Sequence, residues 1–377
     1  MTTNNIPYFI YLDSKIVGAA RQIVTFFNNG IFPIENTVIL IKKYKHKSAK
    51  IIEQVFKQGG ISYRFVKAAD LDALTSGIIF YPFNAQSNCR AVANRRLTHI
   101  FITHGESNKI ASVKPIIRIY DHIITAGQAG IERFLANKIF NCYDVNSGRL
   151  VKMGDTFIGR TGLASVGQGK KTIFYAPTWE GGIELENYSS LSYTNEVANC
   201  MKHFSKQYDV NTVLIKPHPN TGHRCREYNQ YLISLVELLL SEGLKIVLFK
   251  PHITIPFHIV WRLKRKGVVF ESELNKYYAV LGFCDISAIE TQFLNEQIYY
   301  YIFCSKIHKS YLLGLKVANY YKTHAIEFTQ SELPNRISEI DFNELKEYLI
   351  DNSCLNIPIS ERINYLLNNL HDYAEYI

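Results

Sequence analysis

Short apolar runs alternate with longer stretches of helical period along this chain. Runs rich in Ile, Val, Phe and Tyr occupy residues 7–12, 36–41, 62–66, 77–83, 98–103 and 121–126. Between them, residues 47–58 and 87–96 carry helix-like patterns. Strands that alternate with helices are typical of βα units, so the pattern predicts an α/β fold with parallel sheets.

A second series of predicted elements begins after the Gly-rich, basic stretch GRTGLASVGQGKK (159–171), which we interpret as a linker or crossing loop. Predicted strands follow at residues 172–176, 212–216, 245–249, 267–270, 278–283 and 298–303. Residues 342–376 are predicted to be wholly helical, with core positions at Leu345, Leu349, Ile363, Leu366 and Leu367. We therefore expect domains at residues 1–160 and 161–340, followed by C-terminal helices at 341–377.

Length and composition agree with two globular domains. The 377 residues exceed what one core usually organises, and 47% are hydrophobic. The seven cysteines show no CxxC pair or metal-ligand spacing, so we expect reduced, mostly buried thiols and no metal site. No signal peptide is evident, and no apolar run reaches the roughly 18 residues of a membrane span, which predicts a cytoplasmic protein.

The net charge of +9 favours polyanionic partners of any kind. Basic residues cluster at KKYKHK (42–47), NRR (94–96) and WRLKRK (261–266). These clusters are interpreted as solvated faces or, alternatively, as contacts to the anionic inner face of a membrane. A non-catalytic module that binds nucleic acid fits the charge, but no nucleic-acid motif of recognised spacing is present.

Polar residues follow the strand predicted at 98–103. His104 stands at the end of that strand as a candidate general base, since an unperturbed imidazole titrates near neutral pH. Gly105 would let the backbone approach a ligand closely. The alternative is a simple turn in which Thr103 and Glu106 form a capping box.

Two further clusters follow predicted strands in the second half. In YAPTWEG (175–181), Thr178 offers a hydroxyl and Trp179 a ring that could stack a nucleobase or fill a core. In KPHP (216–219), Lys216 and His218 suit the stabilisation of a phosphoryl group. Lys250 begins a near copy, KPH (250–252), which is a weaker candidate.

The last cluster is DISAIE (285–290), reached from the strand predicted at 278–283. Ser287 and Glu290 have capping-box spacing, so a helix should begin there. The unpaired N–H groups of a helix start attract anions, although an ordinary capped helix explains the pattern as well. Because all four clusters follow predicted strands, we expect them to meet at one crevice between the domains.

In this order the clusters resemble the CDP-glycerol glycerophosphotransferase family, whose members carry His-Gly-Thr, Tyr-Ala-Pro-Thr, Lys-x-His-Pro and Asp-x-Ser-Ser elements. The corresponding segments here are HGE (104–106), YAPTW (175–179), KPHP (216–219) and DISA (285–288), and the resemblance spans roughly residues 98–303. It implies two Rossmann-like domains facing a cleft, the glycosyltransferase B arrangement, with the donor nucleotide held mainly by the C-terminal domain. It implies no cofactor and no metal.

The resemblance also implies residue roles. His104 would activate an acceptor hydroxyl, while Lys216 and His218 would steady the donor phosphates. The donor-binding residues expected around them are Gly105, Glu106, Ser107, Lys109, Thr178, Trp179, Asp285, Ser287, Ala288 and Glu290.

The implied reaction moves a glycerol-phosphate-type unit from a CDP-activated donor to a cell-surface glycan or lipid-linked acceptor, with release of CMP. Glu106 and Ala288 depart from the family pattern, since a hydroxyl is lost at both positions. The donor therefore stays open between CDP-glycerol, CDP-ribitol and another nucleotide polyol. The alternative function is a glycosyltransferase B enzyme that uses a nucleotide sugar in capsule or lipopolysaccharide synthesis.

Overall fold

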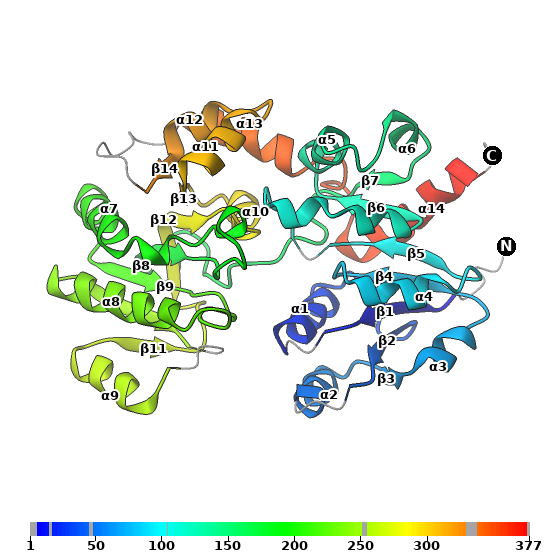
Figure 1. The fold of residues 1–377 in the computed structure, drawn as a ribbon, viewed down its shortest axis with the longest axis horizontal. Coiled ribbons are helices and arrows are strands. Elements are labelled where there is room, and N and C mark those ends of the chain that lie inside the picture. The colour runs from blue at the N-terminus through cyan, green and yellow to red at the C-terminus, as the bar shows by residue number, and fades with distance from the viewer. Residues whose placement is uncertain are drawn as a thin grey trace. The chain divides into compact units, whose positions relative to one another are not determined.

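The computed structural model describes residues 6–14, 17–44, 48–103, 105–250, 255–328 and 338–374. The chain forms two compact units (Figure 1). Unit 1 comprises Met1–Glu106, Val113–Gly159 and Glu347–Ile377, and unit 2 comprises Ser107–Ser112 and Arg160–Lys346. The chain leaves unit 1 inside the predicted linker. It returns at Glu347, so the C-terminal residues complete unit 1 instead of forming a separate region from residue 341.

The described part of unit 1 is built on a seven-stranded parallel sheet of order β3-β2-β1-β4-β5-β6-β7 (Figure 1). The strands are β1 (Tyr8–Leu12), β2 (Thr37–Lys42), β3 (Tyr63–Val66), β4 (Ile78–Tyr81), β5 (Thr98–Phe101), β6 (His122–Thr125) and β7 (Leu150–Lys152). The helices are α1 (Val17–Asn28), α2 (Ser48–Gln58), α3 (Ala68–Asp72), α4 (Cys89–Val92), α5 (Gln128–Ala136), α6 (Cys142–Asn146) and α14 (Arg362–Ala374).

Unit 2 has a parallel sheet with seven strands among the described residues, of order β11-β10-β9-β8-β12-β13-β14. The strands are β8 (Lys170–Ala176), β9 (Thr212–Ile215), β10 (Lys245–Phe249), β11 (Val269–Glu271), β12 (Tyr277–Asp285), β13 (Tyr300–Cys304) and β14 (Ala325–Glu327). The helices are α7 (Thr194–Gln207), α8 (Glu227–Ser241), α9 (Phe257–Arg265), α10 (Ile289–Asn295), α11 (Lys306–Leu313) and α12 (Asn319–His324). Helix α13 (Glu339–Leu349) spans the return to unit 1.

The apolar runs form strands because both faces of each sheet are covered. In β1, Tyr8, Ile10 and Leu12 pack into one hydrophobic cluster, and Phe9 and Tyr11 pack into another. Successive side chains of a strand point to opposite faces, so a strand between two helical layers is apolar throughout. The α/β prediction is confirmed, with every predicted strand present. The three-residue strands β7 and β14 were not predicted, because such short segments show little periodicity.

The prediction that residues 342–376 are wholly helical is wrong, because two helices are separated by a stretch that is mostly not helical. Helix α13 ends at Leu349, and α14 begins only at Arg362. Between them Pro358, which has no backbone N–H, precedes a short 3₁₀ turn, and the Asp351 N–H donates to the Ala126 carbonyl oxygen at 2.8 Å. The predicted core positions Leu345, Leu349, Ile363 and Leu366 are buried, and Leu367 is half-buried.

All seven cysteines are free, and Cys200, Cys284, Cys304 and Cys354 are buried. Within the described residues no helix is long and apolar enough to cross a bilayer.

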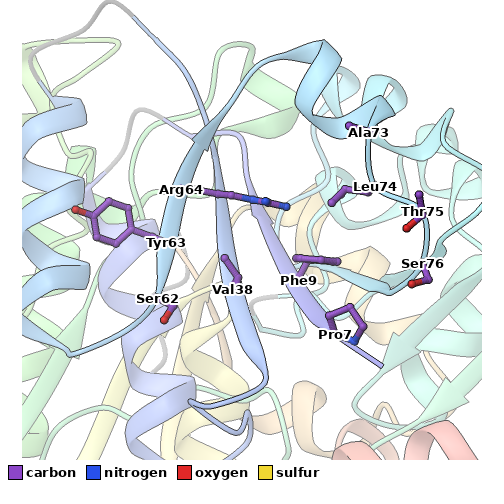
Figure 2. Close-up of a pocket in the computed structure, with 10 residues that line it drawn as sticks. All are labelled: Pro7, Phe9, Val38, Ser62, Tyr63, Arg64, Ala73, Leu74, Thr75 and Ser76. Carbon is purple, nitrogen blue, oxygen red and sulfur yellow. The ribbon is translucent and has the colours of Figure 1, made fainter. Parts of the chain in front are cut away.

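A shallow cavity of about 480 Å³ opens in unit 1 at the amino ends of β1, β2 and β3. Figure 2 shows the Arg64 side chain extending over Phe9, whereas Tyr63 points away from both. The remaining lining residues are Pro7, Val38, Ser62, Ala73, Leu74, Thr75 and Ser76. In a parallel sheet this edge is opposite the carboxyl ends, where the sequence clusters lie, so the cavity is separate from the site that they predict.

We predict that Leu366→Ala destabilises the protein by about 2–5 kcal/mol, because it removes a fully buried side chain from the α14 contact with the unit 1 core. Equilibrium urea unfolding measures the effect. The matched control is Leu355→Ala in the same C-terminal segment, where the side chain is 62% exposed. That variant should change stability by less than about 0.5 kcal/mol. Equal losses in the two variants would contradict the docking of α14 on unit 1.

Candidate functional site

Three of the sequence clusters follow neighbouring strands of unit 2. Strand β8 lies between β9 and β12, and the register pairs Ala176 with Cys284 and Tyr175 with Ile215. The carboxyl ends of the three strands are therefore adjacent. The strand order also reverses between β8 and β12, which is the place where doubly wound sheets bind ligands.

Asp285 joins the loops that follow these strands. Its buried carboxylate accepts a hydrogen bond from the Thr178 N–H at 2.7 Å and one from the Ser190 N–H at 3.2 Å. Burial raises the pKa of Asp285 to about 7, against the hydrogen bonds from Ser190 and Thr178 and the charge of Lys109. Asp285 thus fixes the β8 loop beside the end of β12.

Lys109, one of the polar residues that follow β5, belongs to unit 2. Its Nζ donates to Thr178 Oγ1 at 2.7 Å and lies 5.3 Å from the centre of the Tyr188 ring. Burial lowers the pKa of Lys109 to about 8, although the nearby Asp285 carboxylate favours the charged form. Lys109, Thr178 and Asp285, from three separate sequence clusters, therefore form one connected group.

Asn108 is anchored beside Lys109 by a buried polar network. Asn108 Nδ2 donates to the Tyr321 hydroxyl at 3.1 Å, and that hydroxyl donates to Glu290 Oε1 at 2.7 Å. The Tyr300 hydroxyl donates to the same oxygen at 3.1 Å. This network holds the segment Ser107–Ser112 on unit 2.

The predicted capping box of Ser287 and Glu290 is wrong. A helix does begin here, but α10 starts at Ile289 with Ala288 at the N-cap and no side-chain capping bond. Glu290 is instead an acceptor for two tyrosines whose positions the local sequence does not reveal. Ser287 Oγ is buried and has no hydrogen-bond partner among the described residues. A buried hydroxyl without a partner is uncommon, and a ligand oxygen would satisfy it.

Trp179 and His218 stack on each other. Their ring centres are 5.7 Å apart with an interplanar angle of 11°, and the Arg224 guanidinium lies 4.3 Å from the indole centre. The Asn220 N–H donates to His218 Nδ1 at 3.1 Å, which favours the neutral tautomer that carries its proton on Nε2. The indole is thus packed against the His218 imidazole and the Arg224 guanidinium, which both lie in the loop after β9.

Glu180 holds that loop in place and was not singled out from the sequence. Its buried carboxylate accepts hydrogen bonds from the N–H groups of Gly222, Arg224 and Cys225 at 3.0, 2.8 and 3.0 Å. Burial alone would raise the pKa of Glu180, but these backbone donors bring it below its ordinary value. No local sequence pattern indicates this role, because the nearest of these partners is 42 residues away.

Lys216 lies at the end of β9 and contacts the start of unit 2. Its Nζ donates to the Thr161 carbonyl oxygen at 2.7 Å and lies 5.7 Å from the centre of the Phe249 ring. The Thr161 N–H donates to Glu296 Oε1 at 2.9 Å. Burial lowers the pKa of Lys216 to about 8, although Glu296 favours the charged form.

Glu106 belongs to unit 1 and forms a buried ion pair. Its Oε1 is 2.6 Å from Arg133 Nη1, and its Oε2 accepts the Ala126 N–H at 3.1 Å. The alternative capping box of Thr103 and Glu106 is therefore wrong. Thr103 Oγ1 donates instead to the Gly105 carbonyl oxygen at 2.9 Å.

The backbone around the first cluster is strained. Thr103 has a φ of 58°, which is unfavourable for a β-branched residue, and Gly105 has a φ of 136°, which favours glycine. Such strain is found most often at functional sites. Ser107 Oγ accepts the Lys109 N–H at 3.1 Å and so stabilises the backbone from Ser107 to Lys109. His104, Pro251 and His252 lie outside the described residues.

The structure thus brings together Lys109, Thr178, Trp179, His218 and Asp285, with Ser287 and Lys216 on the same sheet edge. Within the described ranges, no three or more His, Cys, Asp or Glu side chains are grouped to hold a metal ion.

No protein-family model and no curated protein matches the sequence. Solved structures do match over nearly the whole chain. A Listeria monocytogenes protein assigned as a UDP-N-acetylglucosamine 2-epimerase has a TM-score of 0.50 at 10% identity, covering 99% of this chain and 97% of that chain. The UDP-bound MnaA of S. aureus has a TM-score of 0.46 at 9% identity, covering 99% and 98%. The wall teichoic acid polymerase TagF has a TM-score of 0.45 at 10% identity, covering 100% and 91%. Together with the two parallel sheets, the first of these matches shows an α/β fold of the glycosyltransferase B type.

We predict that Glu180→Gln speeds amide hydrogen exchange at Gly222, Arg224 and Cys225 by about tenfold or more, because hydrogen bonds to a charged acceptor are replaced by weaker neutral ones. Hydrogen exchange read by mass spectrometry or NMR measures the effect. The control, Glu184→Gln, changes an exposed carboxylate in the same loop and should leave these amides unaffected. Because the pKa of Glu180 is lowered, its carboxylate stays charged through the pH range in which an ordinary glutamate takes up a proton. Protection of the three amides in the wild type should therefore be lost only as pH falls through the lowered pKa. Unchanged exchange in Glu180→Gln would contradict the role of this carboxylate.

Proposed function

We propose that this chain is a transferase that moves a polyol-phosphate unit from a CDP-activated donor to a glycan or lipid-linked acceptor and releases CMP. The observation that carries the proposal is the connected group of Lys109, Thr178 and Asp285 at the sheet edge of unit 2. Thr178 and Asp285 come from two of the four elements that resemble the glycerophosphotransferase family, and Lys109 follows a third, HGE (104–106), at a distance of three residues. Their contact supports the view that the elements serve one site and do not match by chance.

The chemistry requires positive charge and hydrogen-bond donors around a diphosphate. In the proposed reaction an acceptor hydroxyl oxygen attacks the phosphorus joined to the polyol, and the bond from that phosphorus to the CMP oxygen breaks. The hydroxyl proton passes to His104, which the sequence resemblance assigns as the base. Lys109 neutralises the charge that develops on the departing CMP, because such transfer depends mainly on positioning and electrostatic stabilisation.

The other proposed contacts follow from the geometry of unit 2. We assign Ser287 Oγ as a donor to a phosphate oxygen, since the hydroxyl is buried and has no hydrogen-bond partner in the part of the chain that the structure describes. The Nε2–H of His218 is a second donor, held in place by the stack on Trp179 and by the Asn220 N–H. Lys216 has a positioning role in the proposal, because its ammonium group holds the Thr161 carbonyl.

Glu106 and Glu290 are left out of the proposed donor contacts. Each carboxylate already accepts hydrogen bonds from buried protein groups, Arg133 and Ala126 in one case and two tyrosines in the other. The Glu106 carboxylate, which follows Gly105 directly, is fixed by the Ala126 N–H. The carboxylate that replaces the family's threonine is therefore paired with Arg133, which compensates its negative charge.

The second candidate is a glycosyltransferase that uses a nucleotide sugar. It is favoured by the solved structure with a TM-score of 0.50, which is assigned to an enzyme of UDP-N-acetylglucosamine. The two candidates share the nucleotide diphosphate and differ in the bond that breaks. A polyol-phosphate transferase releases the nucleoside monophosphate, whereas a sugar transferase releases the diphosphate.

A donor panel tests the proposal. We predict that the full chain, given CDP-glycerol, CDP-ribitol and UDP-sugars with a membrane extract as acceptor source, releases CMP from a CDP-polyol. Lys109→Met should lower kcat/KM by about 100-fold, because it removes one charge that stabilises the transition state. Lys306→Met, which changes an exposed lysine of unit 2, should leave the rate within about twofold. Release of UDP or CDP would favour the sugar transferase. Full activity in Lys109→Met would contradict the assigned site.

We predict that kcat/KM for the donor falls by about tenfold per pH unit above pH 8, because Lys109, with a pKa of about 8, loses its charge there. An ordinary lysine would keep its charge to about pH 10.4. The lowered pKa means that the fold favours the neutral amine, so this lysine contributes stability at high pH that is lost as pH falls through about 8. Activity should therefore fall without thermal destabilisation.

In Lys109→Arg the falling limb should move to higher pH, since a guanidinium stays charged. A profile that is flat to about pH 10 would contradict this assignment.

A further inference from the structure

Helix α9 exposes two large aromatic side chains on one face. Phe257 is 83% exposed and Trp261 is 54% exposed, one helical turn apart. The helix packs into unit 2 through the buried side chains of Val260 and Leu263. Neighbouring exposed aromatic side chains on a stable helix indicate an interaction surface.

Two cations extend the same face. Lys264 and Arg265 are at the i+7 and i+8 positions from Phe257 and at the i+3 and i+4 positions from Trp261, which lie on one side of a helix. The Arg265 guanidinium lies 4.6 Å from the centre of the Trp261 ring, and Lys264 Nζ lies 5.9 Å from the centre of the Phe270 ring. Within the described residues neither makes an ion pair, so their charge is available to a partner.

The other basic residues of this segment are already paired. Arg262 Nη2 is 3.3 Å and Lys266 Nζ is 2.8 Å from Glu237 Oε1 on α8. In the run WRLKRK, Arg262 and Lys266 are thus paired with α8. Lys264 and Arg265 lie beside aromatic rings instead and make no ion pair within the described residues. In Figure 1, α9 lies next to β11, the edge strand of the unit 2 sheet.

We propose that Phe257, Trp261, Lys264 and Arg265, here called the α9 face, dock unit 2 on an anionic phospholipid surface. Aromatic side chains partition into the headgroup region of a bilayer, and lysine and arginine are attracted to anionic headgroups. A short amphipathic helix that lies flat in the interface presents this combination of side chains. An acidic protein would match the charges but would have to cover both aromatic rings with apolar surface as well.

Cosedimentation of the full chain with vesicles tests the proposal. We expect binding to vesicles of phosphatidylglycerol and phosphatidylcholine in equal amounts, and little binding to phosphatidylcholine alone. Lys264→Gln with Arg265→Gln should weaken binding by more than about tenfold, since each charge contributes about fivefold. Phe257→Ser with Trp261→Ser should weaken it by about tenfold or more, because apolar burial is lost.

The matched control is Arg262→Gln with Lys266→Gln. It removes the same formal charge from the same helix but leaves the α9 face intact, so most of the binding should remain. An equal loss in this control would overturn the proposal in favour of diffuse charge attraction. Unchanged binding in the aromatic double variant would overturn it too. If the wild type does not bind anionic vesicles, the proposal is wrong and an acidic protein becomes the partner to test.

Tryptophan fluorescence gives a second measurement that keeps the α9 face intact. The chain has two tryptophans, so Trp179→Phe leaves Trp261 as the only reporter. Anionic vesicles should shift its emission to shorter wavelength as the indole leaves water, and an unshifted spectrum would overturn the proposal. Neither experiment uses a donor, so the outcome is independent of the proposed transferase activity.

Discussion

The buried carboxylate of Asp285 is the interaction on which the candidate site depends. It accepts the N–H groups of Thr178 and Ser190, and Thr178 is in turn held by Lys109. A carboxylate in this position is costly unless backbone donors and a cation compensate for its lost hydration. The same hydrogen bonds that compensate for the lost hydration fix the loops after β8 and β12, and they place the Lys109 ammonium group beside Thr178.

Desolvation gives the site its chemical properties. Lys109 and Lys216 both have pKa values of about 8, and Asp285 has one of about 7, since burial disfavours each charged form. A bound phosphate would restore to the two ammonium groups the favourable environment that burial removes, whereas it would favour the neutral form of Asp285 further. The buried hydroxyl of Ser287 has no hydrogen-bond partner among the described residues, and a phosphate oxygen would accept a hydrogen bond from it. A site of this kind is better satisfied with an anionic ligand than without one.

The convergence of Thr178, Lys216 and Asp285 at one sheet edge could be predicted, because parallel strands place their carboxyl ends together and each strand was evident as an apolar run. The partners of Glu106, Glu180 and Glu290 could not. Each carboxylate lies next to a recognisable motif, but its donors are 10 to 45 residues away in the sequence and lie on other elements. The capping boxes predicted from local spacing failed for the same reason, since stronger or buried partners competed for the carboxylates.

The sequence by itself determined the α/β class, the strands and the order of the chemical motifs, because periodicity and burial act over a few neighbouring residues. Only the tertiary structure decided which polar side chains meet. It placed residues 107–112 on unit 2, returned the C-terminal helix to unit 1 and separated the paired from the unpaired charges around α9. Hydrogen bonds and ion pairs depend on distances across the fold, such as the 107 residues between Thr178 and Asp285, and no local pattern specifies those distances.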